Sequence, residues 1–434
     1  MTIIRQLSFF LLTLLAGNAL ASNVFLTNST PETVTINVQH YGTDILVEGD
    51  EWEQFVTEIP PYATRKVLRF NRFWGVRRNR DYFFDTHVTS GAQTVVLEQK
   101  MRGTWVDSNV WHSGRGDDFN APWFNGWSIN RFNTEYAGRD SLLGFKPHAT
   151  AGYADFHYTI HNHTQPEPLS GANALKVTTY NIEDLPLSGS NRSERMAAIP
   201  DHVQGYDVIM FQEAFSGLRD QLRLDLASEY PYQTYIPSGD SWNVFDSGIF
   251  IVSRFPITSV TDFIYPDCTG TDCGGQKGVL YAEIIKNGRA HHVTNTHAAS
   301  FDTDAARTLR QIQFQQIRNL VDGQNIPATE AVLMGGDLNV NKFLFPDDHA
   351  QMLSNLNATE PTNTGYEATY DARVNNNIGS DKVQYLDYVV YSNTHLTPVE
   401  SSNDVRVPRS ANDDLWNWWD LSDHFPVMGE FHFE

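Results

Sequence analysis

The pattern of apolar and polar positions divides the chain into two regions. In residues 23–160, short stretches alternate with a period of two, as in "TVTINVQHY", where polar residues separate Val34, Ile36 and Val38. This period is typical of strands with one buried face, and "TRKVLRF" and "QTVVLEQ" predict further strands. We therefore expect residues 22–160 to form a β-rich accessory domain, with a β-sandwich as its architecture.

From residue 174 onward, short apolar runs bounded by turns alternate with helical patterns. Runs such as "ALKVTTYNI", "YDVIMFQE" and "AVLMGGDLN" fit buried strands, and "NRSERMAAIPDHV" predicts a helix. The alternation predicts an α/β fold with helical layers around sheets for residues 174–434. The segment "DAARTLRQIQFQQIRNLV" predicts a second helix, whose apolar face is expected to contain Leu309, Ile312, Ile317, Leu320 and Val321.

The first 21 residues and residues 161–173 are expected to lie outside the folded domains. The segment "MTIIRQLSFFLLTLLAGNALA" has one Arg, an apolar stretch and an A-x-A ending, which is typical of a cleaved secretory signal. The alternative is a membrane anchor, but the apolar run is shorter than the roughly 20 residues of a spanning helix. "HNHTQPEPLSGAN" predicts a linker because it combines prolines with small polar residues. The mature protein is therefore expected to be secreted.

The composition narrows the class of partner. The chain has 434 residues, a formal net charge of −21 and 41% hydrophobic residues, as a folded globular protein would. Non-specific nucleic-acid binding depends on clustered Lys and Arg, so no nucleic-acid partner is expected. An anionic lipid surface would repel this chain, whereas a zwitterionic surface would repel it little. The sequence carries no information on the oligomeric state.

One basic run stands out against this acidic background. The segment "RFNRFWGVRRNRDYFF", residues 69–84, interleaves arginines with aromatic residues. It fits a strand or loop whose Arg side chains lie over aromatic rings. It also fits a surface that docks on lipid headgroups or glycans, and both interpretations stay open.

The two cysteines, Cys268 and Cys273, lie close together in "DCTGTDCGG". In an oxidising compartment they could close a small loop, and we expect a disulfide. A two-thiolate metal site is the alternative, although no His flanks the pair at a zinc-like spacing.

Candidate chemistry is concentrated at the ends of the predicted strands. Any single polar residue there is more often a cap or a loop ion pair, but six segments repeat the pattern. Strand ends on one side of a sheet converge on one cleft in layered α/β folds. The residues delivered in this way are Asn181, Glu213, His297, Asp337, Asn339, Asp387, Asp423 and His424.

These residue types fit divalent-metal-assisted attack on a phosphodiester. Glu213 and Asn181 offer hard oxygen ligands, which suit magnesium rather than zinc, and such a metal would polarise a phosphoryl oxygen. His424 could take a proton from water at near-neutral pH, with Asp387 fixing its tautomer. His297 and Asn339 could donate hydrogen bonds to the phosphate, and the two glycines of "GGDLN" would bring the backbone close to the ligand.

The ordered motifs "YNIEDLP", "FQEAF", "DSGIFIVSRFPI", "NTHAAS", "GGDLNVN", "LDYVVYS" and "SDHFPV" resemble the endonuclease/exonuclease/phosphatase superfamily. Within it, "QEAF" and the loop "CTGTDCGGQKGVLYAEI" are similar to the secreted bacterial neutral sphingomyelinases, also called sphingomyelinase C. The resemblance covers about residues 174–434. It implies a four-layer α/β sandwich and a phospholipase C-type hydrolase that cleaves sphingomyelin to ceramide and phosphocholine. It also implies haemolysis and a requirement for Mg²⁺, for which Mn²⁺ or Co²⁺ could substitute.

The resemblance also implies roles for individual residues. Glu213, Asn181 and Asp423 would bind the metal. His424 would activate water and Asp387 would orient it. The phosphate would be contacted by His297, Asp337 and Asn339. Lys277 in "QKG" would also touch the phosphate, or would be a solvated loop lysine.

A tryptophan cluster precedes the proposed base in "NDDLWNWWDLSDHFPV". Trp416, Trp418 and Trp419 either belong to the core or resemble the exposed aromatic hairpin with which sphingomyelinases touch bilayers. Trp favours the interfacial layer because its ring is apolar and its N–H can stay hydrated.

Other activities share the catalytic motifs. An extracellular nuclease of this superfamily would carry the same motifs, but nuclease activity fits neither the acidic composition nor the tryptophan cluster. A phosphatidylcholine or phosphoinositide hydrolase is a closer alternative. A lectin-like role for the N-terminal domain would leave the catalytic residues unexplained.

Overall fold

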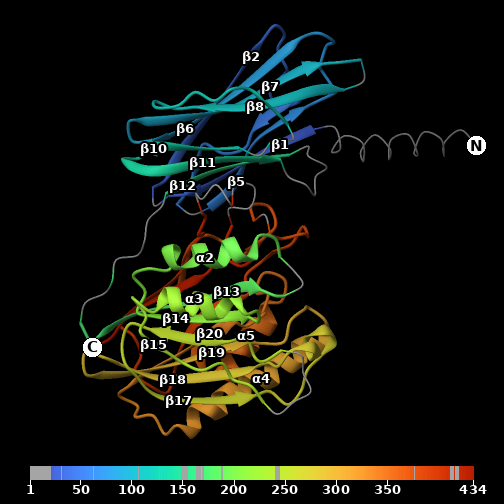
Figure 1. Cartoon of the computed structure of the whole chain (residues 1–434). Helices are drawn as coiled ribbons and strands as arrows, with labels where there is room; N and C mark the ends of the chain where they lie inside the picture. Colours follow the sequence, from blue (N-terminus) through green and yellow to red (C-terminus); the bar gives the residue numbers. More distant parts are fainter. Residues whose placement is uncertain are drawn as a thin grey trace, which may run out of the picture. The chain divides into compact units, whose positions relative to one another are not determined.

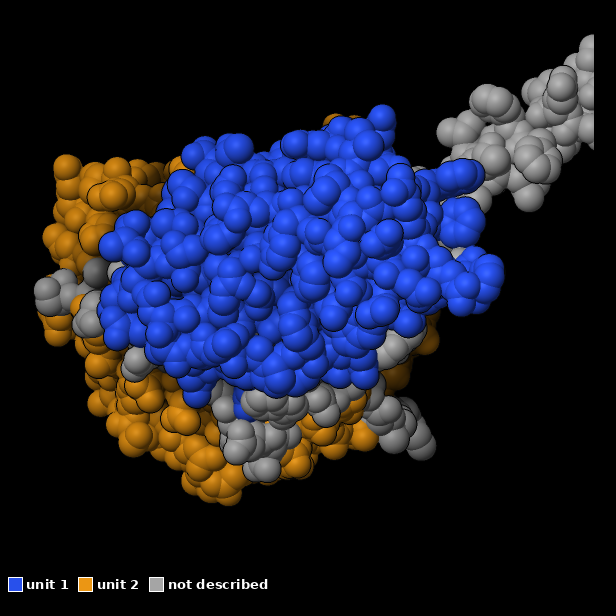
Figure 2. Space-filling model, turned by 90° about the horizontal axis from the view of Figure 1, so that it is seen from above, with its two compact units in different colours: residues 1–163 blue, residues 164–434 orange. Residues whose placement is uncertain are grey.

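The chain divides into two compact units, Met1–His163 and Thr164–Glu434 (Figure 2). The division falls inside the segment predicted as a linker. The computed structural model describes residues 21–434, except for 31, 62, 106, 127, 129, 148–154, 163–167, 169–170, 187–188, 240–244, 376, 411–414 and 416–419. The predicted signal segment therefore lies outside the described residues, apart from Ala21. No described helix is long and apolar enough to cross a membrane.

Unit 1 consists of two six-stranded sheets that share one hydrophobic core. In β2, the alternation read from the sequence holds, since Val34, Ile36 and Val38 are buried and the residues between them are exposed. They pack with Leu26 and Phe84 in the core. The first sheet has β10 (Asn130–Tyr136), β11 (Arg139–Pro147), β12 (Phe156–Asn162), β1 (Ala21–Ser29), β5 (Ala63–Asn71) and β3 (Trp52–Gln54). The second has β4 (Glu58–Ile59), β2 (Val34–Gly42), β6 (Asp81–Ser90), β7 (Gln93–Gly103), β8 (Ser108–Arg115) and β9 (Phe124–Asn125).

The described part of unit 2 contains a seven-stranded sheet, a six-stranded sheet and a two-stranded ribbon. In sheet order, the first has β15 (Tyr232–Gln233), β16 (Phe250–Ser253), β14 (Val208–Ala214), β13 (Ala174–Asp184), β27 (Val427–His432), β26 (Glu400–Val405) and β22 (Thr362–Gly365). The second has β17 (Ile257–Ile264), β18 (Gly278–Lys286), β19 (Arg289–His297), β20 (Ala331–Asp337), β25 (Asp387–Ser392) and β21 (Ala358–Thr359). The ribbon pairs β23 (Tyr370–Asp371) with β24 (Val383–Gln384).

Helices cover the outer faces of these sheets (Figure 1). The helices α2 (Arg192–His202) and α3 (Leu218–Leu226) pack on the first sheet. The helices α4 (Asp304–Gly323) and α5 (Pro346–Leu356) lie beside the second. Side chains of both sheets, such as Met210 and Leu333, form the central core. The predicted four-layer α/β fold, preceded by a β-rich unit, is confirmed.

The predicted apolar face of α4 is partly wrong. Leu309, Ile317 and Val321 are buried, but Ile312 is exposed and Phe314 is buried in its place. Residues advance by about 100° per position in an α-helix, so Ile312 and Ile317 lie roughly 140° apart. Leu320 is half-buried at the border of the face.

One buried ion pair joins the two sheets of unit 2. Lys286 at the end of β18 places its Nζ 2.7 Å from the Asp207 carboxylate that precedes β14. The same amine donates to the carbonyl of Ala174 at 2.7 Å, and the carboxylate accepts from the backbone N–H of Lys176. Both charged side chains are almost completely excluded from water, so neither charge could be left alone at small cost.

We predict that Lys286→Met destabilises the protein by about 3–5 kcal/mol, because it leaves the Asp207 carboxylate buried without its cation. Chemical denaturation would measure the loss. Arg318→Met is the matched control, since its pair with Asp322 is exposed and should be worth about 0–1 kcal/mol. Equal, small losses in both variants would contradict the structural role of the buried pair.

Candidate active site

Strand register brings the polar strand ends together. The strands β13 and β14 run parallel to each other in the first sheet, as do β19 and β20 in the second. The carboxyl ends of each pair therefore lie at the same end of their sheet. In β20, Asp337 lies directly across from His297 on one side and from Asp387 on the other. Asp387 begins its strand rather than ending it. Because β25 is antiparallel to β20, the first residue of β25 lies beside the last residue of β20.

The two glycines of "GGDLN" permit this convergence because their positions leave no room for a Cβ. A Cβ on Gly336 would lie 1.9 Å from the carbonyl oxygen of Thr296, and φ there is +142°. A Cβ on Gly335 would meet Met210 and the carbonyl of Tyr388. The glycines therefore let neighbouring strands and the facing sheet approach closely, and the approach of the backbone to a ligand stays a prediction.

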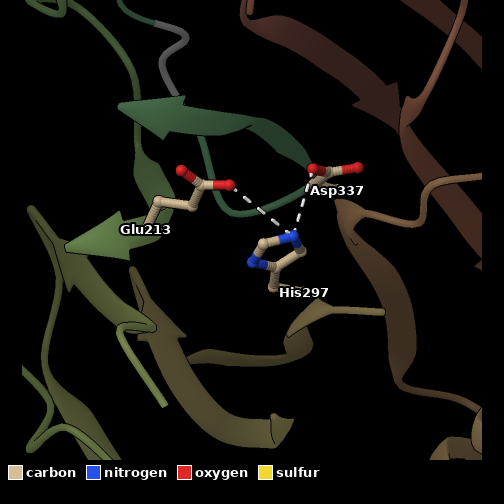
Figure 3. A group of neighbouring side chains, drawn as sticks. All are labelled: Glu213, His297 and Asp337. Carbon is tan, nitrogen blue, oxygen red and sulfur yellow. Dashed lines mark ion pairs between the residues drawn. The ribbon is translucent and has the colours of Figure 1, made fainter. Parts of the chain in front are cut away.

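Glu213, His297 and Asp337 form one group of possible metal ligands (Figure 3). The Nε2 atom of His297 lies 3.8 Å from a Glu213 carboxylate oxygen and 3.5 Å from one of Asp337. Asn181 donates from Nδ2 to the same Asp337 oxygen at 3.1 Å. Glu213 has a left-handed backbone with φ 58°, a conformation that a non-glycine residue adopts at a cost and that clusters at functional sites.

The electrostatics of this group favour a cation. Burial and the neighbouring Asp423 carboxylate raise the pKa of Glu213 to about 7. Burial also raises the pKa of Asp337 to about 6, although the nearby charge of His424 opposes the shift. Carboxylates that resist ionisation side by side gain most from a divalent ion with oxygen ligands. The donor set therefore fits a divalent metal.

A second group contains the proposed base. His424 Nδ1 lies 2.8 Å from Asp387 Oδ2, and its Nε2 is 3.9 Å from Asp337. Burial by itself lowers the pKa of His424, but the carboxylates of Asp387 and Asp337 raise it well above its usual value. Asp387 therefore holds the ring at Nδ1, and Nε2 is the nitrogen left for a reacting proton.

Most of the candidate residues line a cavity of about 460 Å³. Asn181 and Asp387 do not line it. They are fully buried behind it and hold Asp337 and His424 from the rear. The predicted residues that line the cavity are Glu213, Lys277, His297, Asp337, Asn339, Asp423 and His424.

Asn339 and Lys277 are both fixed by hydrogen bonds at the cavity wall. Asn339 donates from Nδ2 to the carbonyl of Ala298 at 3.2 Å, and its backbone N–H donates to Asp337 at 3.0 Å. Lys277 donates to the same carbonyl at 2.8 Å and to Ser300 Oγ at 3.0 Å. Its side chain is only 10% exposed, so the alternative of a solvated loop lysine is wrong.

Two residues of the site escaped the sequence reasoning. Glu183 follows Asn181 on β13, and burial together with Asp423 raises its pKa to about 8. The acidic "NIED" run was the available signal. Tyr370 lines the cavity, with its ring centroid 5.3 Å from that of His424. No local sequence signal distinguishes this tyrosine from the others.

The predicted disulfide is confirmed, because Cys268 and Cys273 are bonded and close the loop around the short helix η2 (Gly270–Gly274). Asp272 in this loop accepts from the backbone N–H of Ser300 at 2.6 Å, so the loop contacts the cavity wall. The prediction for Trp416, Trp418 and Trp419 lies outside the described residues.

Comparison with known proteins agrees with this geometry. The model of the Endonuclease/Exonuclease/phosphatase family matches residues 178–424, which span every candidate ligand and the base. The chain belongs to the endonuclease/exonuclease/phosphatase family. Its resemblance to sphingomyelinase C is also confirmed. A sphingomyelinase C of Bacillus cereus is 32% identical over 292 residues, which cover 59% of this chain and 88% of that protein. A phospholipase C of Staphylococcus aureus is 30% identical over 285 residues, with 58% and 86% covered.

Solved structures of this family give the same result. Sphingomyelinase C from Streptomyces griseocarneus superimposes with a TM-score of 0.54 at 31% identity, covering 60% of this chain and 99% of that one. A beta toxin variant from Staphylococcus aureus with bound magnesium ions gives a TM-score of 0.55 at 29% identity, covering 60% and 99%. Each similarity covers about the length of unit 2 in this chain.

We predict that a divalent metal stabilises the protein more at pH 8 than at pH 6. The raised pKa values of Glu213 and Asp337 mean that, without metal, the folded state binds more protons than the unfolded state. Stability of the metal-free protein therefore falls as pH rises through this range, and the raised pKa of His424 acts in the same direction. Thermal unfolding with magnesium or with chelator at about pH 6 and about pH 8 would measure the effect.

The control is Glu213→Gln, which removes the titrating carboxylate and one ligand charge. It should show a weaker pH dependence without metal and a smaller metal-induced rise in unfolding temperature. His297, whose lowered pKa acts in the opposite direction, is common to both proteins. An unchanged metal response in the variant would argue against Glu213 as a ligand.

Proposed function

We propose that this chain is a secreted, Mg²⁺-dependent sphingomyelin phosphodiesterase that releases ceramide and phosphocholine. The observation that carries the proposal is the convergence of Glu213, His297, Asp337 and His424 on one cavity, with Asp387 holding His424 from behind. The sphingomyelinase C relatives support the choice of substrate. The magnesium ions in the beta toxin variant support the choice of metal.

Each residue has a role that follows from its position. Glu213 and Asp423 would hold the metal from the cavity wall, and Asn181 would support the ligand set from behind through Asp337. When bound, the metal would polarise a phosphoryl oxygen and offset the negative charge of the acidic group. Because Nδ1 is held by Asp387 at 2.8 Å, Nε2 of neutral His424 would accept a proton from the attacking water, once the charge of a bound metal offsets the carboxylates that raise the pKa of His424.

The phosphate would be held by neutral and positive donors. Burial, with the charge of Lys277 nearby, holds the pKa of His297 well below its usual value, so this imidazole stays neutral and can donate one hydrogen bond. Asn339 and Lys277 lie on the same cavity wall. Fixed donors stabilise charge that develops in the transition state at little reorganisation cost.

Secretion, haemolysis and membrane contact complete the proposal. The A-x-A signal pattern and the disulfide both fit an oxidising, extracellular location. Release of phosphocholine from a bilayer would alter the outer leaflet, which is the basis for proposing haemolysis. Trp416, Trp418 and Trp419 are proposed to contact the lipid surface because they precede the base in sequence.

A substrate panel tests the proposal directly. The protein would be incubated with sphingomyelin, phosphatidylcholine, phosphoinositide and plasmid DNA, each with magnesium or with chelator, and phosphorus-containing products would be measured. We expect release of phosphocholine from sphingomyelin, abolished reversibly by chelator. Hydrolysis of DNA or phosphoinositide in place of sphingomyelin would reassign the enzyme within its family, and full activity in chelator would refute the metal mechanism.

We predict that His424→Ala lowers the turnover number by about 10²–10⁴-fold, the usual contribution of a general base. Asp387→Asn should also lower turnover, because the amide can stabilise the wrong imidazole tautomer and gives no charge to the imidazolium. Binding of sphingomyelin vesicles should persist in both variants. Turnover close to that of the parent in His424→Ala would remove His424 from the mechanism.

A further inference from the structure

Three loops leave the same end of one sheet in unit 1. Gly42 at the end of β2 pairs with Tyr82 at the start of β6, and Tyr82 pairs with Met101 near the end of β7. The connections at this end are residues 43–51, 72–80 and 104–107, and we name their described residues, all except Val106, the loop tip. The tip contains most of the basic run that stood out in the sequence.

Polar contacts join the three loops into one surface. Arg77 Nε lies 3.4 Å from the Asp44 carboxylate, which links residues 72–80 to residues 43–51. Arg72 lies 3.2 Å from the Asp107 carboxylate, which links them to residues 104–107. The backbone N–H of Gly103 donates to the carbonyl of Arg80 at 3.1 Å. These contacts give the tip a defined arrangement of side chains.

Large apolar side chains project from this surface into water. Trp105 is 77% exposed and Trp74 is 58% exposed, which is unusual for the largest apolar side chain. Ile45, Val47 and Phe73 are also exposed on the tip. Monomeric proteins rarely expose several such side chains together unless the patch binds a partner.

The chemistry of the patch fits the interfacial layer of a bilayer. The Arg78 guanidinium lies 3.5 Å from the centre of the Trp105 ring, so a cation and an aromatic ring share one exposed site. Trp prefers the boundary between headgroups and acyl chains, and Arg can reach lipid phosphates from there. The tip carries four arginines and five acidic residues, so it matches a zwitterionic surface better than an anionic one.

We infer that the loop tip of unit 1 is a docking surface for zwitterionic phospholipid bilayers. Trp74 and Trp105 insert at the headgroup level, while Arg77, Arg78 and Arg80 contact phosphate groups. This surface consists of residues of unit 1, whereas the residues that line the cavity belong to unit 2, and lipid docking by the tip does not depend on the proposed hydrolysis. The basic aromatic run therefore serves a lipid surface rather than a glycan.

The test measures binding of the full chain to vesicles of phosphatidylcholine alone by cosedimentation, in chelator. We expect Trp74→Ala/Trp105→Ala to weaken partitioning by about tenfold, because two partly inserted aromatic side chains are removed. The matched control is Trp123→Ala, which removes a tryptophan that is 42% exposed outside the tip. The control should bind as the parent does. Thermal unfolding should be unchanged in the double variant, since both side chains are exposed.

Several results would overturn the inference. Parent-like partitioning of Trp74→Ala/Trp105→Ala is one, and an equal loss in Trp123→Ala is another. Stronger binding when phosphatidylserine is added would show an anionic rather than a zwitterionic target. Failure of the parent to bind vesicles, with tip-dependent binding to immobilised glycans, would make the tip a glycan site. A parent dimer that the double variant converts to monomer would make the tip an interface between copies.

Discussion

The removal of closely spaced carboxylates from water, together with their mutual repulsion, is the constraint around which unit 2 is organised. Glu213, Asp337 and Asp387 come from three strands of two facing sheets, and Asp423 lies near Glu213. A group of acids out of water is unfavourable unless cations or hydrogen bonds compensate. The raised pKa values of Glu213 and Asp337 express that cost in the metal-free chain. The packed sheets supply the stability that keeps the group together.

The site consists of residues that line the cavity and of buried residues behind them that hold their side chains in place. Asn181 and Asp387 are fully buried and hold Asp337 and His424 from behind. The residues in front line the cavity, where substrate and metal would meet them. Buried supporting partners fix the rotamers of the residues they contact, which is how a site keeps its geometry without substrate. The same reasoning explains the glycines before Asp337, because strands that approach closely leave no room for a Cβ.

The two units carry different candidate surfaces. Unit 2 carries the possible metal ligands and the His424–Asp387 pair, and unit 1 carries the exposed aromatic tip. A chain with a net charge of −21 gains no general electrostatic attraction to a membrane. Adhesion would then depend on local apolar and aromatic contacts, whose free energy comes from area removed from water rather than from charge.

Local patterns in the sequence were enough to predict the α/β fold, the β-rich unit and the residues at the strand ends. Alternation at Val34, Ile36 and Val38 follows from the pleat of a strand, and "GGDLN" marks a strand end wherever it lies in space. Residues far apart in sequence meet only through strand register. The pairing of Asp337 with both His297 and Asp387 depended on which strands became neighbours. For the same reason, the participation of Tyr370, the burial of Lys277 and the assembly of the loop tip were decided by tertiary structure, because local periodicity holds no information about contacts between distant segments.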